Sequence, residues 1–142
     1  MMMQKRQLAA YRSSLDVEVE TASPHKLILL LFDGALSAIR QAKMLIGNKE
    51  RLGEKGKLIG KAIAIIEEGL RLGLDLEKGG ELATNLDALY AYCSGRLLDA
   101  NLKNDVVILG EVEALLLDLR DAWAMIAKPQ EMTGANANVG SV

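Results

Sequence analysis

The residues best suited to nucleophilic or acid–base chemistry are the single histidine and the single cysteine of this 142-residue chain, His25 and Cys93. An imidazole on the exposed middle of a bundle helix can accept a phosphoryl group, and a thiolate beside a histidine can attack a substrate. His25, however, directly follows Pro24, which places it in the first turn of a helix. We therefore expect an ordinary exposed residue, and a phosphotransfer protein acting through His25 is the alternative.

Metal and cofactor sites find little support in the composition. Cys93 lies on an apolar helical stripe, where a cysteine is usually a small core residue. One cysteine and one histidine cannot supply a Cys/His zinc cluster or the paired Glu-x-x-His motifs of a di-iron bundle. The Gly79-Gly80 pair lacks the Gly-Lys-Ser/Thr ending of a phosphate-binding loop. The sequence predicts no catalytic residue, no metal and no cofactor, so we expect a protein that is not an enzyme.

Charge and hydropathy exclude two further classes of partner. The 17 basic and 19 acidic residues give a net charge of −2, whereas nucleic-acid binding normally needs a clearly basic face. The longest apolar run, residues 27–32, is far shorter than the roughly 20 residues that span a bilayer, and no stretch resembles a signal peptide. We therefore expect a cytosolic protein without nucleic acid or a transmembrane segment, and a solvated basic face over residues 40–73, Lys55 included.

The elements that position these residues are predicted to be all helical. Ser23 can cap the free amides of a helix that starts at Pro24, and Asn104 or Asp105 can cap the last one. The predicted helices cover residues 24–46, 50–74, 81–100 and about 105–127, with a polar turn at 101–104. Helices of this length joined by short loops pack as an antiparallel up-down four-helix bundle.

The two ends of the chain differ from this helical domain, which we place at residues 23–127. We expect residues 1–22 to be a flexible, partly extended segment, and a short helix near residues 8–11 is compatible with its sequence. Residues 128–142 have too little apolar content to pack and are predicted to be a disordered tail.

The apolar faces of the predicted helices are wider than a four-helix bundle needs, since such helices bury about three residues in seven. The surplus has two explanations: a seam between two copies of the chain, or a groove that receives amphipathic helices of a partner. Several glycines between residues 53 and 73 could serve close helix approach or helix flexing. Both questions stay open at this level.

Several different short motifs follow one another in a fixed order along most of the chain. The first comprises Tyr11, residues 17–28 (VEVETASPHKLI) and residues 31–35 (LFDGA). Others lie at 61–66, 74–75, 79–86, 89–92, 97, 100–101, 105, 111–112, 115–116, 120 and 122–123. Together they closely resemble the FliS-type flagellin export chaperones, whose Thr-Ala-Ser-Pro run is followed by Leu-Tyr-Asp-Gly-Ala. Phe32 stands where that family usually has tyrosine.

The resemblance implies a helical bundle without enzymatic activity, a monomer or weak homodimer in the cytosol. It implies binding of the disordered C-terminal segment of flagellin, which folds into helices along the bundle. The bound flagellin is thereby kept from premature polymerisation and is delivered to the flagellar type III export gate. A co-chaperone is a further candidate partner. It also implies that the N-terminal segment around Tyr11 covers part of the groove in the free protein.

Helical spacing predicts which face of the third helix lines the groove for the partner. Asn85, Leu89 and Tyr92 share one face, which we assign to the groove. Leu82, Leu86, Tyr90, Cys93 and Leu97 form a second row, which we assign to the core. The complete set of groove and lid candidates is Tyr11, Thr21, Leu27, Ile63, Ile66, Asn85, Leu89, Tyr92 and Asn101.

Overall fold

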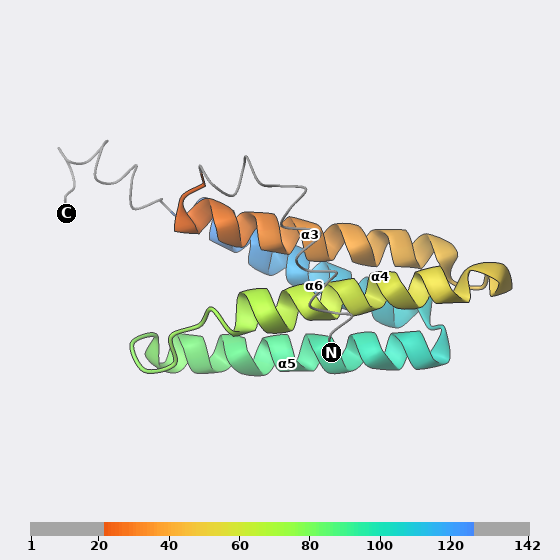
Figure 1. Cartoon of the computed structure of the whole chain (residues 1–142). Helices are drawn as coiled ribbons and strands as arrows, with labels where there is room; N and C mark the ends of the chain where they lie inside the picture. The colour runs from red at the N-terminus through yellow and green to blue at the C-terminus, as the bar shows by residue number, and fades with distance from the viewer. Residues whose placement is uncertain (1–21, 127–142) are drawn as a thin grey trace.

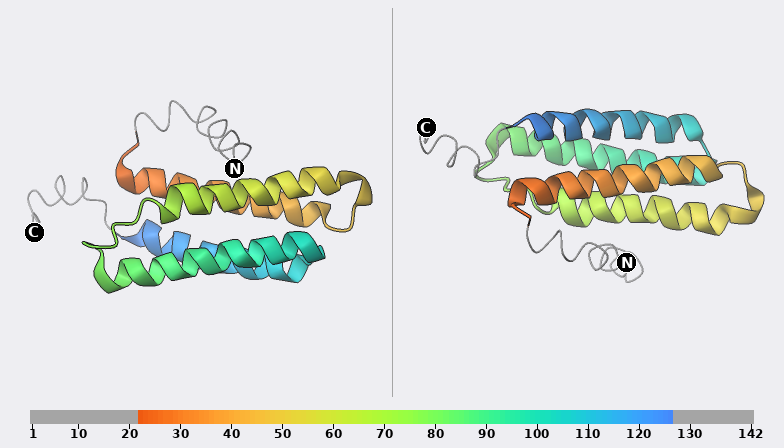
Figure 2. Two further views of the ribbon diagram at one scale, coloured as in Figure 1. Left: turned by 60° about the horizontal axis from the view of Figure 1, so that its bottom comes forward. Right: turned by 90° about the horizontal axis from the view of Figure 1, so that it is seen from above.

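The computed structural model describes residues 22–126, and within them four helical rods lie side by side (Figure 1). The rods are α3 (Pro24–Leu45), α4 (Leu52–Ala64) continued by η2 (Ile65–Arg71), α5 (Gly80–Lys103) and α6 (Val106–Met125), with a short turn η1 (Lys49–Arg51) before α4. α3 packs against α4, η2 and α6, while α5 packs against the same three elements from the other side. Successive rods run in opposite directions in both views of Figure 2. The predicted all-α up-down bundle is confirmed.

Side-chain caps mark the starts of α3 and α6, whereas α4 and α5 begin without one. The Ser23 hydroxyl accepts a hydrogen bond from the Lys26 amide at 3.1 Å, with Pro24 in the first turn. An Asp105 carboxylate oxygen accepts from the Val107 and Ile108 amides at 2.9 and 3.3 Å. These bonds satisfy amides that have no partner within their own helix, so both predicted starts are confirmed.

The predicted polar turn at 101–104 is wrong, because α5 continues to Lys103. Asn104 alone reverses the chain, in the left-handed conformation at φ 50°. Asparagine tolerates this conformation because its short amide makes local hydrogen bonds. Here the Asn104 side-chain oxygen accepts from the Lys55 ammonium group at 2.5 Å, and the Asn101 carbonyl accepts from the same group at 3.0 Å. Lys55 is only 4% exposed, so the prediction that it belongs to a solvated face is also wrong.

The second predicted helix changes type near its end. From Ile65 to Arg71 the turns are π-helical, and the Leu72 amide bonds to the Glu67 carbonyl at 3.2 Å. Gly69 lies in this stretch, and a Cβ there would be 3.0 Å from a Leu31 methyl group of α3. Close helix approach therefore explains Gly69. It does not explain Gly53, around which a Cβ would meet nothing within 4 Å.

The core between the rods is aliphatic. Its largest fully buried side chains include Leu36, Ile39, Ile59, Leu97 and Leu116. On α5 the predicted core row is confirmed for Tyr90, Cys93 and Leu97, which are at most 4% exposed. Leu86 is half-buried, and Leu82 is 69% exposed. The core assignment of Leu82 is therefore wrong, since the row leaves the core towards the start of α5.

Candidate partner-binding surface

Nucleophilic chemistry at Cys93 is disfavoured by its surroundings. The side chain is fully buried, and burial raises the pKa of its thiol to about 11. At neutral pH the group is a thiol, and the thiolate is the reactive form. Among residues 22–126, no three histidine, cysteine, aspartate or glutamate side chains are grouped to hold a metal ion.

His25 is held in a clasp with Trp123 that joins the start of α3 to the end of α6. The imidazole Nε2 donates to the Trp123 carbonyl at 2.9 Å, and the Trp123 indole donates to the His25 carbonyl at 3.0 Å. The two rings stack with centroids 5.0 Å apart. His25 is 3% exposed, so the prediction of an exposed residue is wrong. A phosphoryl acceptor needs an accessible nitrogen, but Nε2 is bonded and Nδ1 is enclosed.

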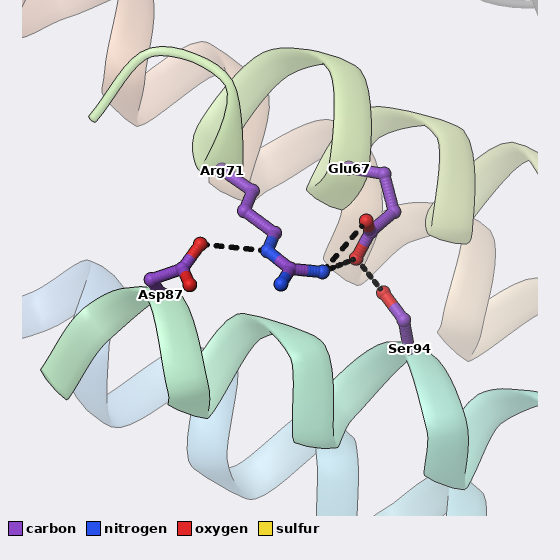
Figure 3. A network of polar contacts seen from close by, with 4 residues as sticks. All are labelled: Glu67, Arg71, Asp87 and Ser94. Carbon is purple, nitrogen blue, oxygen red and sulfur yellow. Dashed lines mark hydrogen bonds and ion pairs between the residues drawn. The ribbon is translucent and has the colours of Figure 1, made fainter. Parts of the chain in front are cut away.

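One flank of α5 is fastened to η2 by a polar network (Figure 3). The Arg71 guanidinium donates to Asp87 at 2.7 Å and to Glu67 at 3.0 Å, and the Ser94 hydroxyl donates to Glu67 at 2.7 Å. The two carboxylates raise the pKa of Arg71, with the hydrogen bond to Asp87 as the largest cause. These contacts show that Asp87 and Ser94 lie on the side of α5 that faces η2.

The opposite flank of α5 is fastened to α6. The Tyr92 hydroxyl donates to Glu111 at 2.6 Å, and Arg96 donates to the same carboxylate at 2.9 Å. The hydrogen bond from Tyr92, and then that from Arg96, hold the pKa of Glu111 below its ordinary value. In turn, the bond to Glu111 raises the pKa of Tyr92. Tyr92 is still 47% exposed, so part of its ring remains free for a partner.

The predicted groove residues do not converge on one patch. Asn85 is exposed and Leu89 half-buried on the α5 flank that carries Tyr92, so these three do lie together. Asn101 is half-buried on the flank towards α4, where its carbonyl binds Lys55. Leu27 and Ile63 are partly exposed on α3 and α4 respectively.

Three of the predicted groove and lid residues have no described surface position. Ile66 is fully buried in the core, so it presents no surface in the described bundle. Tyr11 and Thr21 lie outside the described residues, as do the predicted N-terminal lid and the C-terminal tail.

The sequence reasoning missed an uncharged face on the outside of α5, which we call the α5 outer stripe. It consists of Ala88, Ala91, Gly95, Leu98 and Leu102. Leu98 and Leu102 are 52% and 77% exposed, and the space around Gly95 is open. The alternating steps of three and four residues are the spacing of a helix–helix contact. That spacing is visible in the sequence, but only the fastened flanks establish that this face points outwards.

No helix within residues 22–126 is long and apolar enough to cross a membrane.

Comparison with known proteins places this bundle among flagellar proteins. The model of the family "Flagellar protein FliS" matches residues 7–130. The flagellar secretion chaperone FliS of Salmonella typhimurium is 49% identical over 114 residues, which are 80% of this chain and 84% of that protein. FliSB of Pseudomonas aeruginosa is 51% identical over 110 residues, covering 78% and 86%. FliS of Bacillus subtilis is 42% identical over 105 residues, covering 74% and 76%. With most of both chains aligned at such identity, this chain belongs to the FliS family.

Proposed function

We propose that this chain is a cytosolic flagellar secretion chaperone, not an enzyme, and that it binds the C-terminal segment of flagellin. The observation that carries the proposal is the match to the FliS family over the whole bundle, together with relatives named as flagellar secretion chaperones. Binding keeps the segment from polymerising and presents flagellin to the export gate. A co-chaperone is a further candidate partner.

The surface that we propose for the flagellin segment runs along α5. The α5 outer stripe supplies apolar contact without a charge to desolvate, and the exposed ring of Tyr92 and the amide of Asn85 flank it. An amphipathic helix binds such a surface through residues three and four apart. Because the segment folds as it binds, part of the contact energy is spent on ordering it.

The remaining candidates have secondary places in this proposal. Leu89 lies on the Tyr92 flank, and Asn101 lies near the end of α5. Leu27 and Ile63 extend the surface onto neighbouring helices if the segment wraps around the bundle. The N-terminal segment with Tyr11 and Thr21 is the proposed removable cover of the binding surface.

The test is a titration of the chain with a synthetic peptide of the flagellin C-terminal region from the same organism. We expect a gain of helical circular dichroism beyond the sum of the two components. Leu102→Glu on the α5 outer stripe should weaken binding by about tenfold or more, because it places an unpaired charge in an apolar contact. Met44→Glu on α3 is the matched control, since Met44 is similarly exposed at 84% against 77% for Leu102. The absence of any helical gain with the unmodified chain would refute the proposal.

A helical homodimer is the second candidate, because the same three-and-four spacing on the α5 outer stripe suits pairing with another copy. Sedimentation velocity separates the two. A monomer without peptide that forms a one-to-one complex with it supports the chaperone, whereas a stable dimer that Leu102→Glu dissociates supports self-association.

A further inference from the structure

The bundle contains an apolar cavity of about 400 Å³ at the end where α3 begins and α6 ends. Residues from α3, η2, α5, α6 and the loop before α5 line it. The start of α3, the start of α5 and the end of α6 lie at this same end of the bundle (Figure 1). The lining residues on which the argument depends are Asp75, Leu82, Tyr90, Ala122, Trp123 and Ile126. Leu82 and Ile126 are 69% and 53% exposed, so the cavity opens to solvent on their side. This is an open pocket, not a sealed packing defect.

The charge of the lining restricts what can enter. Asp75 is the only acidic residue among the lining residues, and none of them is basic. The Asp75 carboxylate already accepts hydrogen bonds from the Glu77 and Lys78 amides at 3.2 and 2.9 Å. An anion in this pocket would find no cation and would face a carboxylate. Because burying an unpaired charge is costly, the lining selects against anions.

One polar group in the wall is unused. Tyr90 is 4% exposed and its ring lies against Phe32, with centroids 6.4 Å apart. Within residues 22–126 its hydroxyl has no hydrogen-bond partner, whereas the Trp123 indole N–H already donates to the His25 carbonyl. Apart from His25 Nδ1, no enclosed side-chain nitrogen or oxygen within residues 22–126 lacks a partner, so this unpaired hydroxyl is accessible to a solvent-sized molecule. Burial raises the pKa of Tyr90 to about 12, so the group stays a neutral donor.

We propose that this end cavity binds a neutral, largely apolar small molecule whose single oxygen pairs with the Tyr90 hydroxyl, such as a medium-chain alcohol. The size is suitable, because a cavity of roughly 150 Å³ already holds benzene and ligand pockets start near about 300 Å³. The occupant would touch all four rods at once and so stabilise their packing. The site does not depend on the binding of flagellin.

The test compares 1-octanol with octanoate, which share a chain length but differ in charge. Trp123 is the only tryptophan of the chain and lines the cavity, so its fluorescence reports occupancy. With the full chain we expect a saturable blue shift and a rise in melting temperature with octanol, since a ligand of the native state stabilises it. Octanoate should bind at least about tenfold more weakly.

Two matched pairs of variants locate the site. Tyr90→Phe should weaken octanol binding about three- to tenfold through loss of one hydrogen bond, whereas Tyr92→Phe should leave it unchanged. Ala122→Leu fills the mouth from an exposed position and should weaken binding about tenfold, while Ala114→Leu, also exposed on α6 but away from the cavity, should not. The proposal is overturned if octanol gives no saturable shift, if octanoate binds equally well, or if the members of either pair behave alike.

Discussion

The clasp between His25 and Trp123 predicts that removing the imidazole destabilises the folded chain. The sequence alone predicts an exposed His25, whose removal would change stability little. His25→Ala removes the ring stacking, worth about 1 kcal/mol, and one hydrogen bond, worth about 1 kcal/mol net. The Trp123 carbonyl is not orphaned, since it also accepts from the Ile126 amide at 3.1 Å. The full penalty for an unpaired buried group therefore does not apply. With the lost burial of the imidazole, we expect a destabilisation of about 2–3 kcal/mol.

Urea unfolding at neutral pH, with a thermal melt as a second probe, measures this loss. At about 4 °C per kcal/mol for a chain of this size, the melting temperature should fall by about 8–12 °C. Lys26→Ala is the matched control, because Lys26 is the exposed neighbour of His25 in the same helical turn and should change stability by less than about 0.5 kcal/mol.

A double-mutant cycle separates the clasp from a general weakening of the helix start. His25→Ala and Trp123→Leu should each destabilise the chain, and their combination should cost at least about 1 kcal/mol less than the sum. If His25→Ala matches Lys26→Ala, or if the two changes simply add, the imidazole is not coupled to the end of α6 and the reasoning fails.

Three further predictions concern other contacts. Lys55→Ala should destabilise by about 1–3 kcal/mol in urea unfolding, because the Asn101 carbonyl and the Asn104 side-chain oxygen lose the hydrogen bonds from the buried ammonium group, and the exposed Lys57→Ala, expected to be neutral, is its control. In Gly69→Ala the new Cβ lies 3.0 Å from a Leu31 methyl group, which has to shift to make room, whereas the new Cβ in Gly53→Ala meets nothing within 4 Å and should stabilise by about 0.5–1 kcal/mol. In urea unfolding Gly69→Ala should therefore be less stable than Gly53→Ala, and equal effects would contradict the close approach. Hydrogen bonds from Lys43 and then Arg40 lower the pKa of Glu113 from 4.5, so these contacts stabilise the folded chain above about pH 4.5 and stop doing so as the pH falls through the folded-state pKa. In Glu113→Gln the free energy of unfolding should therefore fall less steeply as the pH is lowered through this range.

Sequence reasoning predicted most accurately those features that local chemistry determines. Ser23 and Asp105 cap helices through amides two or three residues away, so a short sequence window contains the whole interaction. The helical periodicity likewise predicted the bundle and the buried positions of Tyr90, Cys93 and Leu97. These features need no knowledge of what lies across the fold.

The errors share a different cause, which is contact with residues distant in sequence. His25 is buried because Trp123, 98 residues later, stacks on it. Lys55 is buried because its ammonium group reaches the end of α5, where carbonyls lack helical partners. Ile66 lies in the core although its spacing alone permits a surface position. Which side of α5 faces out depends on Glu67 and Glu111, and no pattern within α5 contains that information.

The fastening of α5 bears on how a partner helix would be received. Arg71 and Glu67 hold one flank and Glu111 holds the other, so the outer stripe is presented by a helix tied on both sides. A flagellin helix docking there, as proposed, would desolvate exposed Leu98 and Leu102 without opening the core. Docking at Ile66 would require the rods to separate and would expose the aliphatic side chains between them. The first route leaves the bundle intact and spends binding energy only on ordering the partner, which favours the outside of α5 over the core as the docking surface.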